Sequence, residues 1–233
     1  MAAPLTPGQI YLADQRGLLE SPQQQRYCTL NFGTYAADGR GPLGSLRAVN
    51  EELLAPGQAV TLVAAHATHL VLLPILGAVA FHTAAGQVGA ADVEQVQVLN
   101  LSPGSTVELR NPYEQELITF LHLWLDAAPD ALATSDCFEY RFGALDNQLT
   151  ELVPPAPQRQ FTLHLGCFQG RREAVYQVSD PNHRLFAFVL AGAFEVEGRL
   201  LHEKDALALW EARAVELEAL SNNAFVLLVE LPG

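Results

Sequence analysis

Short apolar runs separated by turn-forming residues dominate this chain. The runs at residues 70–76, 117–125, 161–168 and 224–230 are rich in Val, Leu and Phe, and each ends close to Gly, Pro, Asn or Asp. Runs of this length with turn residues between them are typical of strands in a sandwich or barrel, and helical periodicity is scarce. The pattern therefore predicts an all-β protein.

The predicted strands fall into two series with a less patterned stretch between them. That stretch holds Pro154-Pro155-Ala156-Pro157, which is typical of a linker or an edge loop. We expect an N-terminal barrel at residues 1–128, a linker with edge strands at 129–160 and a C-terminal barrel at 161–233. The expected strands are residues 27–35, 60–63, 70–76, 78–82, 93–98, 106–109 and 117–125 in the first series, and 161–168, 173–178, 185–190, 193–196, 206–209, 215–219 and 224–230 in the second.

The two series also repeat one pattern. Residues 73–81 read LPILGAVAF and residues 188–196 read FVLAGAFEV, so in both a strand meets a Gly-Ala turn and a return strand. Each segment is followed by a Gly, by an Asp (Asp92 or Asp205) and by a further strand. This internal similarity predicts two similar barrels in tandem.

Composition and charge narrow the possible functions. Hydrophobic residues make up 49% of the chain and charged residues 17%, which indicates a folded protein with a sizeable core. The formal net charge is −13 and Lys204 is the single lysine, so direct binding to nucleic acid is not expected. No apolar run reaches the roughly 18 residues that cross a bilayer, and the N-terminus does not read as a secretory signal. We therefore expect a cytoplasmic protein that binds no membrane.

Three cysteines, Cys28, Cys137 and Cys167, lie far apart in the sequence. An odd number at long spacings favours reduced, buried thiols over a disulfide framework or a zinc site. Cys28 follows Tyr27, and a redox role for its thiol is the alternative that stays open.

Several segments together resemble the pirin family of bicupins. Residues 44–57 read GSLRAVNEELLAPG, residues 31–35 read NFGTY and residues 121–126 read LHLWLD, with His122 where pirins usually carry glutamine. Residues 205–231 are similar to the last strands of the pirin C-terminal cupin, and the chain looks closest to the metal-lacking branch typified by the bacterial protein YhaK. The resemblance implies two tandem cupin barrels of the RmlC-like jelly-roll type.

The resemblance also implies where a metal would bind. Pirins hold a metal, usually iron, in the N-terminal barrel through three His and one Glu. Counted from Gly57, the first two histidine positions fall on Val63 and Ala65, and the glutamate position of the general cupin motif falls on His69. In the second motif, LSPGSTVELRN at 101–111, the third histidine position falls on Val107, and a shifted register would offer Glu108 or Leu109. Valine and alanine offer no lone pairs, so we expect no metal and an apolar pocket at Val63, Ala65, His69 and Val107.

A rebuilt metal site is the alternative. It would use His66, His69, His82 and His122, with Glu108 as a further donor, to hold iron or another divalent transition metal. Residues three apart on a regular strand face opposite ways, so His66 and His69 converge only across a bulge. In the C-terminal half the corresponding frame falls near Val178, Asp180 and Arg184, and neither His164 nor His202 has a partner at metal-ligand spacing.

The sequence favours a binding or regulatory protein without a catalytic site. It holds no Gly-x-Ser-x-Gly elbow, no phosphate-binding glycine loop and no Cys-x-x-Cys motif. The expected partner is a small apolar molecule or another protein, and the chain could act as a monomer. The competing hypothesis is a metal-dependent oxygenase similar to quercetin 2,3-dioxygenase, which the shifted histidine site would require.

Overall fold

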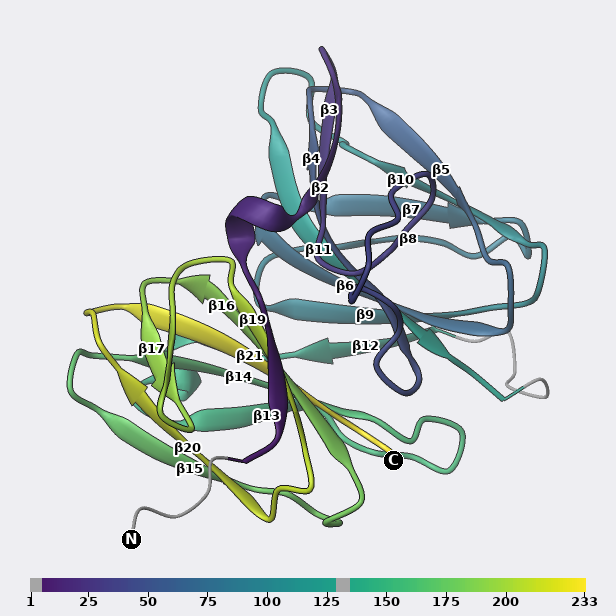
Figure 1. Cartoon of the computed structure of the whole chain (residues 1–233). Helices are drawn as coiled ribbons and strands as arrows, with labels where there is room; N and C mark the ends of the chain where they lie inside the picture. Colours follow the sequence, from purple (N-terminus) through teal and green to yellow (C-terminus); the bar gives the residue numbers. More distant parts are fainter. Residues whose placement is uncertain (1–5, 129–134) are drawn as a thin grey trace, which may run out of the picture. The chain divides into compact units, whose positions relative to one another are not determined.

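The computed structural model describes residues 6–128 and 135–233. Within these ranges the regular structure is all strand apart from two short 3-10 helices, and every pair of neighbouring strands is antiparallel. The expected all-β fold is confirmed. The described residues divide into two compact units: residues 16–128 and 135–139 form one, and residues 6–15 together with 140–233 form the other (Figure 1).

The unit of residues 16–139 contains two sheets, which we call the N-terminal barrel. The larger sheet has the strand order β12-β9-β6-β11-β4-β3-β2, and the smaller has the order β5-β10-β7-β8. The strands are β2 (Gly17–Ser21), β3 (Gln24–Cys28), β4 (Leu46–Leu54), β5 (Ala59–Val63), β6 (Thr68–Leu76), β7 (Val79–Thr83), β8 (Val88–Ala91), β9 (Gln95–Leu101), β10 (Thr106–Arg110), β11 (Ile118–Asp126) and β12 (Ser135–Glu139).

The second unit, the C-terminal barrel, has the same arrangement. Its larger sheet has the order β1-β19-β16-β21-β14-β13, and its smaller sheet has the order β15-β20-β17-β18. The elements are β1 (Gly8–Tyr11), η1 (Ala13–Gln15), η2 (Phe142–Leu145), β13 (Leu149–Val153), β14 (Thr162–Phe168), β15 (Glu173–Gln177), β16 (Arg184–Ala191), β17 (Phe194–Val196), β18 (Arg199–Leu201), β19 (Ala206–Trp210), β20 (Ala214–Ala219) and β21 (Ala224–Leu231).

The repeat predicted from the sequence corresponds to equivalent hairpins. In the N-terminal barrel Gly77 separates β6 from β7, and in the C-terminal barrel Gly192 separates β16 from β17. Their φ angles are 71° and 77°, in the left-handed region that glycine adopts most readily. A Cβ atom on Gly77 would lie 2.9 Å from Ile118 and Tyr113, and one on Gly192 would lie 2.4 Å from the Ser221 hydroxyl. Both turns therefore require glycine.

Two edge strands change the expected domain boundaries. Gly8–Tyr11 pairs with Ala206–Leu209, so β1 is an edge strand of the C-terminal barrel rather than part of a domain at 1–128. Ser135–Glu139 pairs with Gln95–Leu99, so β12 is an edge strand of the N-terminal barrel and lies in the segment expected to hold a linker with edge strands. β13 also lies at the edge of its sheet, and the sequence predicted edge strands within residues 129–160. The boundaries differ because edge pairing joins residues distant in sequence.

One predicted strand is too long. Residues 27–35 were expected to form a single strand, but β3 ends at Cys28 and the chain then turns, with a bridge between Phe32 and Tyr35. Gly33 has a φ of 59°, and the buried Arg40 guanidinium donates to the carbonyl of Thr29 at 2.8 Å, which holds the turn. Neither 3-10 helix in the described ranges is long and apolar enough to cross a bilayer.

Candidate functional site

Aliphatic side chains line the inner faces of β5 and β10 in the N-terminal barrel. Leu62 and Ala64 at the end of β5, and Val107 and Leu109 on β10, are all buried in one hydrophobic core. Successive side chains of a strand point to opposite faces, so burial of Leu62 and Ala64 turns their odd-numbered neighbours outward. The inner face of this sheet therefore presents only hydrocarbon at these four positions.

Part of the expected apolar pocket is wrong. Val63 is 61% exposed and Ala65 is also exposed, so neither faces the interior, whereas Val107 is buried within the packed hydrophobic core. The polar Thr61 shares a face with Val63 and is exposed, and this was the signal in the sequence that the odd-numbered positions face solvent. His69 is buried, and its Nδ1 lies 2.6 Å from the Asn100 Oδ1.

The metal-binding set implied by the family does not fit this barrel. Three histidines and one glutamate hold a metal through nitrogen and oxygen lone pairs. Counted from Gly57, two of the histidine positions fall on Val63 and Ala65, whose side chains face solvent. If the motif is shifted by one residue toward the N-terminus, these two positions fall on Leu62 and Ala64, whose side chains face the core. None of these side chains can donate to a metal.

The four histidines of the alternative metal site are not brought together. His66 is exposed in the loop after β5, and His82 is exposed on the outer face of β7. His122 is fully buried on the inner face of β11. Glu108 pairs across the sheet with His82 on the outer face. Over residues 6–128 and 135–233, no group of three or more His, Cys, Asp or Glu side chains is placed to hold a metal.

A buried polar layer lies on the inner face of the larger sheet of the same barrel. Glu52 on β4 is fully buried and accepts from Arg26 Nε at 2.5 Å and from Gln24 Nε2 at 2.7 Å. His122 Nε2 lies 3.2 Å from the same carboxylate, and Trp124 Nε1 lies 2.8 Å from His122 Nδ1. We call Arg26, Glu52, His122 and Trp124 the polar layer.

The hydrogen bonds of the polar layer fix the tautomer of His122. An indole N–H can only donate, so His122 Nδ1 accepts from Trp124 and the ring proton lies on Nε2, from which it is donated to Glu52. Burial lowers the pKa of His122 despite the neighbouring carboxylate, which keeps the ring neutral. Both ring nitrogens are therefore occupied, and the ring has no lone pair left for a metal.

Glu52 is held as a carboxylate by its partners. Burial raises the pKa of its carboxyl group, but the hydrogen bond from His122 and the charge and hydrogen bond of Arg26 outweigh burial, and the pKa is lowered below 4.5. Buried polar atoms without a partner remain beside this pair among the described residues: Arg26 Nη2 and both side-chain amide atoms of Asn50. Within the layer, Arg26 and Glu52 form a buried ion pair, and both nitrogens of the neutral His122 ring are hydrogen-bonded.

A second polar cluster occupies the interior of the C-terminal barrel. Glu230 on β21 is 3% exposed and accepts from Tyr176 Oη at 2.6 Å, from the Ser179 backbone N–H at 3.0 Å and from the Ser179 hydroxyl. His183 Nδ1 lies 2.7 Å from the same carboxylate. Burial raises the pKa of Glu230, but these hydrogen bonds outweigh burial and lower it below 4.5.

This cluster does not have the geometry of a catalytic triad. In a triad the serine and the acid bind opposite nitrogens of the imidazole. Here Ser179 Oγ lies 3.2 Å from His183 Nδ1, which is the same nitrogen that faces Glu230. Of the remaining positions considered for this barrel, Asp180 accepts from the Asn182 backbone N–H in the turn, and Val178 packs on the core. The hydrogen bonds of Ser179 and His183 to Glu230 hold the turn between β15 and β16 against β21.

A hollow of about 400 Å³ lies at one end of the N-terminal barrel. Its walls come from the start of β4, the end of β11 and the loops that precede β6 and β10. We call it the Arg47 hollow, and its lining residues are Arg47, His66, Ala67, Pro103, Asp126 and Ala127. Its residues His66 and Ala67 directly follow Ala65, one of the positions expected to line a pocket.

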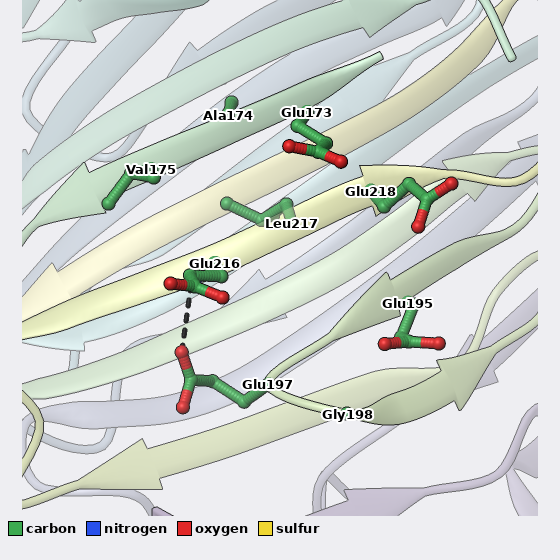
Figure 2. A pocket seen from close by; sticks show the side chains of 9 residues that line it. All are labelled: Glu173, Ala174, Val175, Glu195, Glu197, Gly198, Glu216, Leu217 and Glu218. Atoms are coloured by element: carbon green, nitrogen blue, oxygen red, sulfur yellow. Dashed lines mark hydrogen bonds between the residues drawn. The ribbon is translucent and has the colours of Figure 1, made fainter. Parts of the chain in front are cut away.

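The outer face of the smaller C-terminal sheet carries five glutamates around a hollow of about 220 Å³ (Figure 2). Glu218 on β20 lies directly opposite Glu173 on one side and Glu195 on the other. Like charges opposite one another across a sheet destabilise it. The Glu197 carboxylate accepts from the backbone N–H of Glu216 at 2.8 Å. Five glutamates by themselves do not indicate which ligand this hollow would bind. Their carboxylates repel one another at neutral pH.

The two barrels, each made of one larger and one smaller antiparallel sheet, define a bicupin. Residues 158–231 match the family model of the quercetinase C-terminal cupin domain. Over 232 residues, 96% of this chain and 99% of the relative, the chain is 22% identical to a quercetin 2,3-dioxygenase of Escherichia coli strain K12. The expected pirin resemblance is confirmed.

Solved structures agree with this assignment of the fold. The chain is similar to the bacterial pirin YhhW from Escherichia coli in complex with nickel(II), with a TM-score of 0.84, 16% identity and coverage of 97% of this chain and 99% of that one. It is also similar to YhaK from Escherichia coli, with a TM-score of 0.73, 22% identity and coverage of 89% and 94%. The two likenesses show a shared bicupin fold.

Replacing Glu52 tests the polar layer. In Glu52→Gln the buried Arg26 charge loses its counterion, and we expect the free energy of unfolding in urea to fall by about 3 kcal/mol. The double variant Arg26→Met with Glu52→Leu removes both charges and should lose less than the single variant. If the double variant is as unstable as Glu52→Gln, the ion pair is not the cause.

Acid titration tests Glu230. The pKa of Glu230 is lowered in the folded protein, so the unfolded state takes up the proton first as the pH falls. The stability that the Glu230 carboxylate contributes is therefore present above pH 4.5 and is lost as the pH falls below that value. In Glu230→Gln this contribution is absent, so its free energy of unfolding should fall less steeply between about pH 5 and 3 than that of the parent. Urea unfolding at each pH measures this, with Glu203→Gln as the exposed control. Equal slopes for parent and Glu230→Gln would contradict the account.

Proposed function

We propose that this protein is a bicupin that binds a small molecule without oxidising it and acts in the cytoplasm as a monomer. The observation that carries the proposal is the chemistry of the inner faces of β5 and β10, where Leu62, Ala64, Val107 and Leu109 are buried. Hydrocarbon side chains at these four positions cannot donate to a transition metal. The proposal therefore assigns no catalytic residue to the N-terminal barrel.

The remaining polar groups of that barrel support the same conclusion. His122 uses one ring nitrogen to accept from Trp124 and the other to donate to Glu52. The Glu52 carboxylate is shared among Arg26, Gln24 and His122. Groups that are engaged in this way would have to break buried hydrogen bonds before they could ligate a metal or act on a substrate, at a cost of about 1–3 kcal/mol for each group left unpaired.

A metal-dependent oxygenase is the competing function. The observation in its favour is the name of the curated relative, a quercetin 2,3-dioxygenase that is aligned over 96% of this chain. That name describes the relative, and at 22% identity the site has to be present before its chemistry can be carried over. The histidines required by this reading, His66, His69, His82 and His122, do not converge.

Metal content and turnover separate the two functions. The purified protein is incubated with Fe(II), Ni(II) or Cu(II), desalted and analysed by mass spectrometry, and quercetin consumption is followed by absorbance and oxygen uptake. We expect far less than one equivalent of metal and no turnover, while the similar Escherichia coli quercetin 2,3-dioxygenase serves as the active control. About one equivalent of tightly held metal, as a three-histidine, one-glutamate site would bind, would falsify the proposal. Turnover that is lost in His69→Ala would instead establish the oxygenase.

A further inference from the structure

We infer that the Arg47 hollow binds a small, flat carboxylate that carries an apolar ring. This inference deepens the proposed binding role and rests on it, because it names where the ligand is held and which chemistry holds it. The hollow has a volume of about 400 Å³, within the range of about 300–1,000 Å³ typical of small-molecule sites. Its walls combine apolar side chains with a small number of polar groups, which is the usual composition of such a site.

The guanidinium of Arg47 is held in place with one of its edges still open. Nε and Nη2 donate to the Asp126 carboxylate at 2.8 Å and 2.6 Å, so the side-on edge is occupied. The end-on edge, formed by Nη1 and Nη2, has no further partner among the described residues. An arginine edge matches a carboxylate through two parallel hydrogen bonds, and a guanidinium that is already oriented loses less entropy when it binds.

His66 and three apolar residues complete the hollow. The His66 imidazole is exposed and makes no side-chain hydrogen bond within the described part of the chain. Ala67, Pro103 and Ala127 supply the apolar wall against which a ring could pack. A ligand with an apolar ring and one planar oxyanion would therefore satisfy both the wall and the open edge of Arg47.

Backbone hydrogen bonds make the rim of the hollow rigid. The Ala127 N–H donates to the Ala67 carbonyl at 2.9 Å, which ties the end of β11 to the loop before β6. The Ala64 N–H donates to the Ser105 carbonyl at 2.9 Å, and the Gly104 N–H donates to the Ala64 carbonyl at 2.7 Å. These two bonds tie the loop before β10 to the end of β5. A rim preorganised in this way reduces the entropy lost on binding.

Three probes with one ring and different head groups test the inference. Benzoate, benzamide and benzamidine are titrated into the full-length protein and followed by chemical-shift changes in the NMR spectrum. We expect benzoate to bind with a dissociation constant on the order of a millimolar, benzamide more weakly and benzamidine not at all. Because the net charge of −13 repels anions in general, a preference for benzoate has to come from the hollow itself.

Variants then place the binding. Arg47→Gln should weaken benzoate binding at least about tenfold, and Ala127→Phe should abolish it by filling the hollow. Arg110→Gln is the matched control, because Arg110 is also an exposed arginine paired with a carboxylate, Glu108, at 3.2 Å. Absence of benzoate binding, equal binding of benzamidine, or equal loss in Arg110→Gln would overturn the inference. None of these outcomes changes metal content or quercetin turnover, so failure here is distinguishable from failure of the proposed function.

Discussion

Strand alternation is the constraint on which the chemistry of the N-terminal barrel depends. Leu62 and Ala64 face the core with Val107 and Leu109, so Val63 and Ala65 face solvent. A shift of one residue in the pairing of β5 with β10 would exchange the two sets, which is why burial of the even-numbered set fixes the register. Neither Leu62 and Ala64 nor Val63 and Ala65 can ligate a metal. The conclusion that β5 supplies no metal ligand therefore does not depend on which pair is aligned with the two histidines of the family motif.

Four polar side chains inside this barrel bind one another, while both amide atoms of the buried Asn50 lack a partner among the described residues. Arg26, Gln24 and His122 converge on the Glu52 carboxylate, and Phe32 packs beside the layer, 5.8 Å from the His122 ring and 5.4 Å from the Trp124 ring. The histidine stands where pirins usually carry glutamine, and here it takes part in an internal network rather than in a ligand set. Binding capacity is therefore more readily found at the end of the barrel, where Arg47 keeps an open edge, than in its interior.

Local patterns predicted much of the fold and less of the site. The turns at Gly77 and Gly192 and the strands around them follow from apolar runs and glycine positions, which are local features of the sequence. The pairing of β1 with β19 and of β12 with β9 joins distant segments, and no local pattern records it. The β5 run Ala-Val-Thr-Leu-Val is apolar at nearly every position, so only Thr61 indicated which face was buried. The polar layer around His122 likewise draws its side chains from three different strands, β3, β4 and β11.

The accessibility of single cysteines on β5 and β10 tests the central claim most directly. Val63→Cys, Ala64→Cys and Val107→Cys are each treated with a maleimide, and the labelled position is identified by mass spectrometry because the native Cys137 is exposed. The account predicts rapid labelling at position 63 in the folded protein, and labelling at 64 and 107 only after unfolding. Rapid labelling at 64 with protection at 63 would contradict it, because the odd-numbered positions would then line the interior.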